Sequence, residues 1–203
     1  MKDWSALASK ESTQKAIIAL KVNGINAIIV KTGVEAKNKV IEMLPKNAEV
    51  ISMSSVTLDM AGITKEINES GKYDSVKNKL AKMDRETQGL EMQRIGAAPE
   101  YAVGSVHAVT EDGKLLIASN TGSQLPAYTY GASHVIWVAG TQKIVKNLDE
   151  ALKRIYEYVL PLESERLKKL YGVPSNVSKL LIINKEIAPN RLTLILVKEK
   201  LGF

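Results

Sequence analysis

The chain has 203 residues, a formal net charge of +6 and a pI near 9.3, which suits one domain with a sizeable core. Cysteine is absent, so the chain offers no thiolate zinc site, cysteine-ligated iron–sulfur cluster, disulfide or cysteine nucleophile. Its lysines are dispersed among acidic residues and its aromatic residues are scarce, which disfavours a nucleic-acid surface.

The N-terminal residues contain no apolar signal region. No other run approaches the roughly 20 apolar residues that a membrane span requires. The sequence therefore predicts a cytoplasmic protein without membrane insertion.

Strand-like and helix-like stretches alternate through most of the chain, as is typical of an α/β fold. Thr32 and Glu35 have the spacing of a capping box, which predicts that a helix begins there. The predicted elements, in chain order, are a helix over 11–22, a strand over 25–30 buried on both faces, the capped helix up to Pro45, a strand over 49–53, and a helix with Met60, Ile63 and Ile67 on one face.

Residues 73–95 predict one long polar helix with a narrow apolar stripe, which would cover a surface or meet a partner. Three strands and a turn on Asp112-Gly113 follow. The remaining elements are strands over 102–109, 115–118 and 135–139, a helix over 148–160 that Pro161 separates from a helix through 170, and strands over 180–184 and 192–197 that form a hairpin or lie side by side. We expect one α/β domain over 1–203, with 1–23 and 73–95 as peripheral helical segments.

Familiar catalytic motifs are missing from the sequence. It contains no G-x-x-x-x-G-K-[ST], G-x-G-x-x-G, H-E-x-x-H or G-x-S-x-G pattern. Its two histidines, His107 and His134, lie in or beside apolar strands. A histidine in that setting is more often structural than catalytic, so we expect no metal site here.

Small and hydroxylated residues follow several predicted strands. Ligands of open α/β sheets bind beyond the carboxyl ends of strands, where glycine and hydroxyl groups approach them closely. The candidate binding residues are Thr32, Gly33, Ser54, Ser55, Thr57, Asn120, Thr121, Gly122, Ser123, Gln124, Gly140, Gln142 and Lys143. Each taken alone can be explained as a helix cap or a surface residue. Together, in one presumed sheet, they favour a shared cleft for an anionic or carbonyl-bearing molecule, with Lys143 able to pair with a phosphate or carboxylate.

Glu111 is the candidate catalytic residue. It lies at the tip of a turn between two apolar strands. One interpretation is an exposed turn carboxylate. The other is a carboxylate that faces the cleft and acts as a nucleophile or general base.

Residues 102–152 resemble the LUD-domain family of lactate-utilization proteins. The similar features are a Glu-x-Gly turn at Glu111–Gly113, an apolar strand at 115–118, a Ser-Asn-x-Gly element at Ser119–Gly122, a strand at 135–139, and Lys-Ile-Val at Lys143–Val145 before an acidic helix. The ending 190–203 is also similar. The chain departs from many members after the glutamate, where Asp112, Gly113 and Lys114 replace a hydroxyl residue, Gly and Thr.

The resemblance implies a Rossmann-like, mostly parallel sheet with flanking helices, akin to the superfamily of ribose-phosphate isomerase and CoA transferases. It implies a role in organic-acid (L-lactate) utilization, as a non-redox subunit that binds a small anion. Larger relatives carry cysteine motifs for iron–sulfur clusters, so the redox centres would belong to partner subunits and no cofactor is expected in this chain.

Two alternatives stay open beside that role. One is a stand-alone isomerase, CoA transferase or folate-cyclising enzyme that uses Glu111. The other is a non-enzymatic accessory or scaffold protein that holds a partner through the 73–95 helix. The oligomeric state is also open, a homo-oligomer included.

Overall fold

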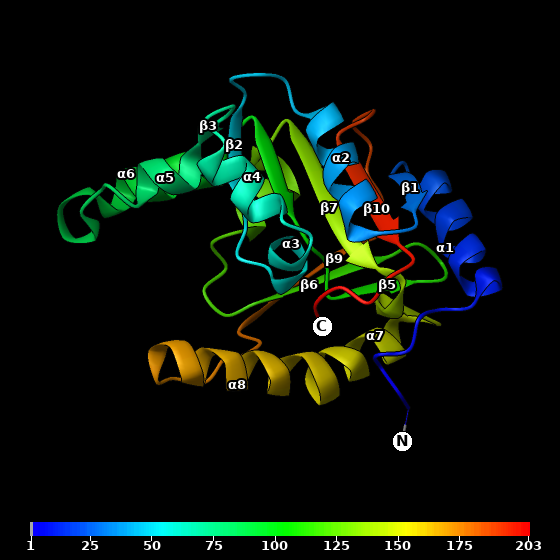
Figure 1. The fold of residues 1–203 in the computed structure, drawn as a ribbon. Helices are drawn as coiled ribbons and strands as arrows, with labels where there is room; N and C mark the ends of the chain where they lie inside the picture. The colour runs from blue at the N-terminus through cyan, green and yellow to red at the C-terminus, as the bar shows by residue number, and fades with distance from the viewer. Residues whose placement is uncertain (1) are drawn as a thin grey trace.

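The structure is a computed structural model that describes residues 2–203, and it contains two β-sheets with helices packed around them (Figure 1). All neighbouring strands of the six-stranded sheet are parallel. In spatial order they are β1 (Asn26–Val30), β10 (Leu192–Val197), β7 (His134–Gly140), β4 (Tyr101–Gly104), β2 (Glu49–Ser52) and β3 (Asp74–Ser75). The predicted Rossmann-like α/β fold is thus confirmed.

A second, four-stranded sheet lies against one face of the first. Its order is β8 (Ile144–Val145), β5 (Ala108–Thr110), β6 (Leu115–Ser119) and β9 (Lys179–Ile183). β5 and β6 form an antiparallel hairpin through the predicted turn, where Gly113 takes a φ of +82° that favours glycine.

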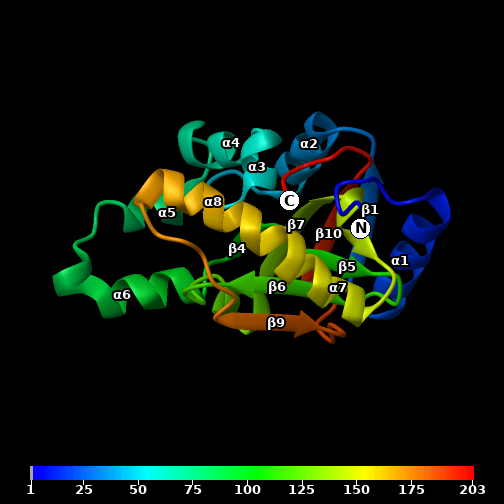
Figure 2. The ribbon, with the colours of Figure 1, turned by 90° about the horizontal axis from the view of Figure 1, so that it is seen from below.

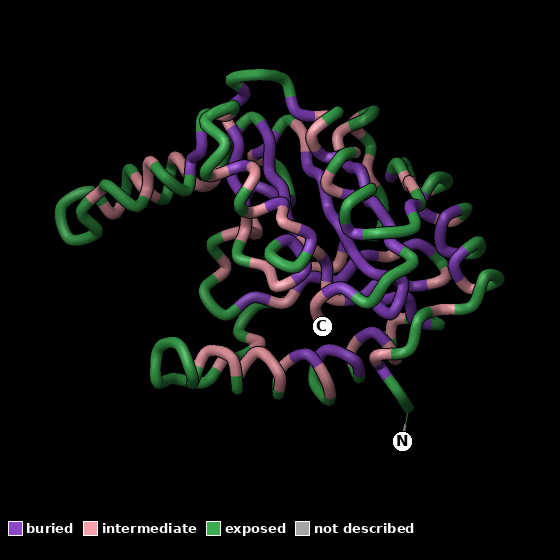
Figure 3. The backbone as a smooth tube through the Cα atoms, viewed as in Figure 1, coloured by how far each residue is buried: buried purple, intermediate pink, exposed green. Residues whose placement is uncertain are grey.

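The helices lie around these sheets and between them. They are α1 (Lys10–Val22), α2 (Gly33–Met43), α3 (Val56–Met60), α4 (Ile63–Glu69), α5 (Val76–Leu80), α6 (Arg85–Ala97), α7 (Leu148–Arg154) and α8 (Leu160–Tyr171), with a short 3-10 turn η2 (Thr141–Lys143) and two π-helical turns, η1 (Ala127–Gly131) and η3 (Ile155–Val159). Figure 3 shows the strands as the buried centre, whereas α6 is exposed or half-buried along its length.

Three apolar clusters define the layers. The first joins α1, η1 and the small sheet to one face of the large sheet, with Trp137 fully buried in it. The second packs α2, α3 and α4 on the other face. The third packs α7 and η3 on the outer face of the small sheet. The central strands of each sheet are therefore covered on both faces, which explains their apolar sequences.

The large sheet's first predicted strand is not buried on both faces. β1 lies at the edge of the sheet and pairs with β10 on one side, and Ile29 is 38% exposed. The predicted C-terminal hairpin is also wrong, because β9 pairs with β6 in the small sheet while β10 lies between β1 and β7. The predicted binding residues consequently follow strands of two sheets instead of one, since those after β6 belong to the small sheet and the others follow β1, β2 and β7 of the large sheet.

The predicted strand over 102–109 is two strands. β4 ends at Gly104 in the large sheet, and β5 begins at Ala108 in the small one. The connection Ser105–His107 carries the chain between the sheets. Both strands are buried and apolar, so the sequence pattern does not reveal that the chain passes from one sheet to the other here.

The predicted helix over 73–95 is interrupted. The chain first adds β3, then forms α5, turns, and starts again as α6. Ser75 caps α5 through its side chain, and Asp84 caps α6 in the same way. These two caps define separate helix starts that the weak apolar stripe did not reveal.

Pro161 does not break the helix that runs from α7 through η3 into α8. It stands in the first turn of α8, directly after the π-helical turn η3. A wider turn relieves the clash between a proline ring and the preceding carbonyl groups. Viewed from below in Figure 2, α8 crosses the molecule in front of the strands. Within residues 2–203, no helix combines the length and apolar character that crossing a membrane demands.

Candidate functional site

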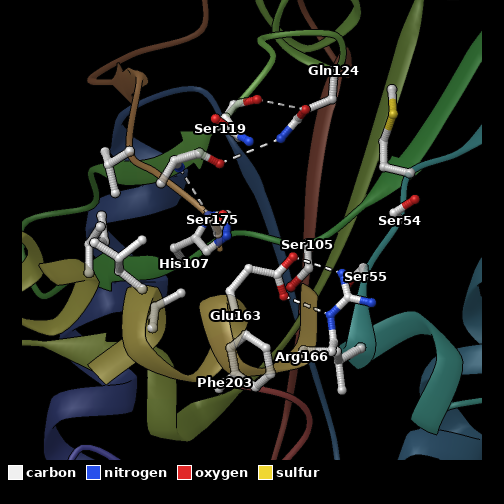
Figure 4. Close-up of a pocket in the computed structure, with 18 of the residues that line it drawn as sticks. Ser54, Ser55, Ser105, His107, Ser119, Gln124, Glu163, Arg166, Ser175 and Phe203 are labelled. Carbon is white, nitrogen blue, oxygen red and sulfur yellow. Dashed lines mark hydrogen bonds and ion pairs between the residues drawn. The ribbon is translucent and has the colours of Figure 1, made fainter. Parts of the chain in front are cut away.

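A cavity lies at the carboxyl edge of the large sheet, and we call it the strand-edge pocket. Its volume is about 330 Å³, within the range of roughly 300–1,000 Å³ typical of small-molecule sites. The segment after β2, the Ser105–His107 connection, the end of β6 and the inner side of η3 and α8 form its walls (Figure 4). The interruption of the predicted 102–109 strand thus supplies one wall.

Lys143 is the most deeply buried charged residue of this pocket. It follows β7 in the turn η2, and it is only 2% exposed. Its Nζ lies 2.9 Å from Thr57 Oγ1, 3.1 Å from Ser105 Oγ and 3.1 Å from the carbonyl oxygen of Val106. Burial, followed by the charge of Arg154, holds the pKa of Lys143 well below its ordinary value.

Arg154, at the end of α7, is completely buried beside the same connection. Its Nη1 donates a 2.6 Å hydrogen bond to the carbonyl oxygen of His107. Its Nε and Nη2 have no hydrogen-bond partner among the described residues. Burial lowers the pKa of Arg154 to about 10, so the guanidinium keeps its charge at neutral pH. Neither Arg154 nor Lys143 forms an ion pair with a carboxylate in residues 2–203.

His107 presents one fixed face to the pocket. Its Nδ1 accepts a 3.0 Å hydrogen bond from the backbone N–H of Ala118, so the proton of the neutral ring is on Nε2. Burial first, then the charges of Lys143 and Arg154, lowers the pKa of His107 to about 3. His107 is therefore a hydrogen-bond donor near neutral pH, and its protonated form is absent there.

An ion pair on α8 lines the opposite wall. Arg166 donates to both carboxylate oxygens of Glu163, at 2.7 Å each, and the two side chains are 34% and 27% exposed. Figure 4 shows this pair facing the Ser105 and Ser55 side of the pocket, with the ring of Phe203 nearby. The pocket thus combines a partly exposed ion pair with a buried lysine that has no carboxylate partner among residues 2–203.

Small polar groups close the end near β6. Ser119 Oγ donates to Gln124 Oε1 at 3.0 Å and accepts from the N–H of Gly122 at 2.8 Å. Asn120 accepts a 3.2 Å hydrogen bond from Ser178. Tyr128 forms part of the wall, and its ring meets Trp137 edge-on.

The structure brings eight of the predicted binding residues to this pocket. They are Ser54, Ser55, Thr57, Asn120, Thr121, Ser123, Gln124 and Lys143. Ser55 also caps α3, as its alternative interpretation stated. Thr57 is 1% exposed and accepts a hydrogen bond from Lys143, so it holds that side chain in place.

The other five predicted binding residues do not line the pocket. Thr32 caps α2, and the N–H of Gly33 donates to Glu199 at 2.8 Å. Gly122 packs on Lys179, where a Cβ would lie 2.5 Å from that side chain. Gln142 donates to the carbonyl oxygen of Leu201 at 2.9 Å. Gly140 leaves space for Gln142, whose Oε1 would lie 2.0 Å from an added Cβ.

Glu111 is also outside the strand-edge pocket. It lies at the far end of the β5–β6 hairpin from His107 and Ser119, beside a second, shallower cavity. Its side chain is 25% exposed and one oxygen lies 3.9 Å from Nζ of Lys15 on α1. Its catalytic role stays a prediction, and the structure places it apart from the buried charges.

Sequence reasoning missed several residues of the pocket. His107 was interpreted as structural, and Ser105 was hidden in a predicted strand. Glu163, Arg166 and Phe203 come from distant parts of the chain and carry no local signal. The break between β4 and β5 was the one detectable clue, because Gly104-Ser105 is an unusual pair inside an apolar run.

No group of three or more His, Asp or Glu side chains in residues 2–203 has the arrangement of a metal site. The donors of the strand-edge pocket are hydroxyl, amide, imidazole, amine and guanidinium groups. This set suits an anion or a carbonyl oxygen better than a cation.

The chain is similar to known proteins in family and in fold. The family model of the LUD domain matches residues 13–197. Among solved structures, a DUF162 family protein from Deinococcus radiodurans matches with a TM-score of 0.60 and 12% identity, over 95% of this chain and 99% of that chain. At that identity the match concerns the fold alone.

A second match, eIF2B beta from Chaetomium thermophilum, has a TM-score of 0.32 and 16% identity over 68% of this chain and 41% of that one, too low to carry an argument. No curated protein matches the chain. Since the family model covers residues 13–197, nearly the whole chain, this protein belongs to the LUD-domain family.

Proposed function

We propose that the protein binds a small organic anion in the strand-edge pocket and serves organic-acid utilization, with L-lactate as the first candidate. The observation that carries the proposal is the buried positive charge of Arg154, which has no carboxylate partner and donates to the carbonyl oxygen of His107, a residue of the pocket wall. A buried charge without a counter-ion is costly, and a bound anion would offset that cost.

The neighbouring donors support the same ligand class. His107 offers Nε2–H, and Lys143 lies on the same wall as Ser105. A carboxylate with an adjacent hydroxyl group matches such a mixture of donors and acceptors. The cavity of about 330 Å³ has room for such an acid together with ordered water or a second small molecule.

The thermal shift of the protein with L-lactate tests this proposal. We expect L-lactate to raise the Tm of the wild type and of His134→Asn, because His134 stacks on Tyr101 away from the pocket. His107→Asn should lose most of the shift, since asparagine keeps an acceptor for Ala118 N–H but removes the Nε2–H donor.

Other outcomes of this screen have defined meanings. Stabilisation by sugar phosphates, CoA esters or folates without any by L-lactate would contradict the lactate assignment and favour a stand-alone enzyme. An equal shift in wild type and His107→Asn would place the binding site elsewhere.

The partner subunits form the second part of the proposal. The chain has no cysteine, so an oxidation of lactate would need iron–sulfur centres in another chain. Anaerobic co-purification from the native host should recover the protein with iron-containing subunits. Recovery of the protein alone, without iron, would contradict this part while leaving anion binding intact.

A further inference from the structure

Lys143 differs from the lysines that form ion pairs on the surface. Lys39, Lys72 and Lys79 each meet a carboxylate and are about half exposed. Lys143 is 2% exposed, and its three partners are two hydroxyl oxygens and a carbonyl oxygen. A lysine that only stabilised the fold would rarely be buried without a counter-ion.

The three hydrogen-bond partners of Lys143 Nζ are neutral oxygen atoms. Ser105 Oγ donates to the carbonyl oxygen of Val138 at 2.7 Å, so its lone pairs accept from Nζ. Thr57 Oγ1 donates to the carbonyl oxygen of Leu201 at 3.1 Å and likewise accepts from Nζ. None of these partners carries a negative charge that would hold the amine in its protonated form.

The surroundings favour the uncharged form of this amine. Lys143 is buried, and the positive charge of the buried Arg154 disfavours a second positive charge on Nζ. A lysine that is desolvated and next to another cationic group is a recognised form of activated nucleophile. The residues that hold Nζ, namely Thr57, Ser105 and Val106, line the pocket together with Lys143 itself. The amine therefore lies at the pocket wall.

We infer that Lys143 is a nucleophile that forms an imine with the carbonyl carbon of a small oxo acid bound in the strand-edge pocket. The inference rests on the proposed anion binding, which would hold the carboxylate of the acid, and it adds a covalent step to that function.

The step balances without an oxidant or a reductant. The lone pair of Nζ attacks the carbonyl carbon, and the nitrogen gives up both of its protons to the former carbonyl oxygen. That oxygen leaves as water, and a C=N bond replaces the C=O bond. His107 lines the same pocket, and its Nε2–H is a donor for the oxygen while it carries negative charge.

Reductive trapping tests the inference. The full-length protein is incubated with glyoxylate, pyruvate or acetoacetate and then with sodium cyanoborohydride, and its intact mass is measured. We expect one adduct per chain whose added mass equals that of the acid less one oxygen atom. Peptide mapping of the wild-type adduct should locate it on Lys143, a readout that requires no variant.

Two lysine variants separate the site from surface chemistry. Lys143→Arg keeps a positive charge without a primary amine and should lose the adduct. Lys146→Arg removes an exposed lysine three residues along the chain and should leave the adduct unchanged. Adducts spread over several surface lysines, or an adduct that persists in Lys143→Arg, would overturn the inference.

Reversible binding distinguishes this inference from the proposed function. Isothermal titration with L-lactate, which has no carbonyl carbon open to an amine, reports anion binding alone. Binding of L-lactate without trapping of any oxo acid would overturn the imine and leave the proposed function standing. Trapping on Lys143 that excess L-lactate suppresses would support both. Absence of both binding and trapping would overturn both.

Discussion

The two ends of the β5–β6 hairpin carry opposite kinds of charge. At one end, His107 and Ser119 face the strand-edge pocket, where Lys143 is buried without a carboxylate partner, and the equally buried Arg154 donates to the carbonyl oxygen of His107. At the other end, Glu111 is a quarter exposed and lies 3.9 Å from Lys15. Charged residues that are partnered at the surface need no further explanation. Buried charges without partners are where a functional ligand is expected.

The largest expected effect comes from Lys143→Met. This change removes the amine that would donate a hydrogen bond to the carboxylate of a bound acid. A hydrogen bond to a charged group contributes about 1.5–3 kcal/mol. The affinity for a bound acid should therefore fall by roughly tenfold to a hundredfold. Isothermal titration with L-lactate measures it.

The same variant should not unfold the protein. The carbonyl oxygen of Val106 keeps a contact from Ser105 Oγ at 3.3 Å, and methionine is an apolar side chain of similar length. Replacing a buried ionisable side chain that has no counter-ion with an apolar one of similar volume is often neutral or stabilising. A Tm equal to or above that of the wild type, together with lost binding, would support a ligand-binding role for Lys143 at the pocket end of the hairpin. A large loss of Tm with binding retained would make Lys143 a structural residue.

The next effect is the pH dependence contributed by His107. Its pKa is about 3 in the folded protein and about 6.5 in the unfolded chain. Between these values the unfolded state binds more protons, so the free energy of unfolding falls as pH falls, and above about pH 6.5 the contribution is constant. The loss approaches about 1.4 kcal/mol for each pH unit well inside that window.

Thermal unfolding at several pH values measures this contribution. From about pH 6.5 to 5, the wild type should lose stability more steeply than His107→Asn, by roughly 2–4 °C of Tm per kcal/mol for a domain of this size. His134→Asn is the matched control and should follow the wild type. Parallel curves for wild type and His107→Asn would show that His107 titrates normally and that its burial does not matter.

A smaller effect, of opposite sign, should follow Glu163→Gln. The carboxylate holds Arg166 on the pocket wall and repels an anion. Its neutralisation frees the guanidinium, and because the pair is partly exposed the gain should be about 0.4–1 kcal/mol, or roughly twofold to fivefold tighter binding. Glu165→Gln on the same helix alters an exposed pair with Lys169 and should change nothing. Weaker binding in Glu163→Gln would mean that the pair must stay intact to shape the pocket.

Several features of this site were predictable from the sequence. Polar residues after an apolar strand identified Ser54 and Ser55 behind β2, and Asn120 and Gln124 behind β6. Such residues have little reason to follow a buried strand unless the strand end is open to a ligand or a cap. Lys143 was found by the same rule, although its burial was not, because a lysine is normally solvated.

Other features could not be read from local patterns. The division into two sheets depends on which strands pair, and buried strands of both sheets have the same apolar character. Because of this division, His107 lies in the wall of the strand-edge pocket and Glu111 lies beside a different cavity. Arg166 reaches the pocket only through the packing of α8, which is a tertiary contact between distant segments.

The smallest expected effect is that of Glu111→Gln, and it tests the comparison most directly. The ion pair with Lys15 is long and partly exposed, so its loss should change the free energy of unfolding by no more than about 0.5 kcal/mol. The substitution leaves the backbone N–H of Glu111, which donates to the carbonyl oxygen of Val145 at 2.9 Å, in place. The Tm shift with L-lactate and the trapping of oxo acids should therefore equal those of the wild type. Loss of either in a folded Glu111→Gln protein would move the functional site to the turn, because no other group there is altered, and would restore the carboxylate that the sequence first singled out as the catalyst.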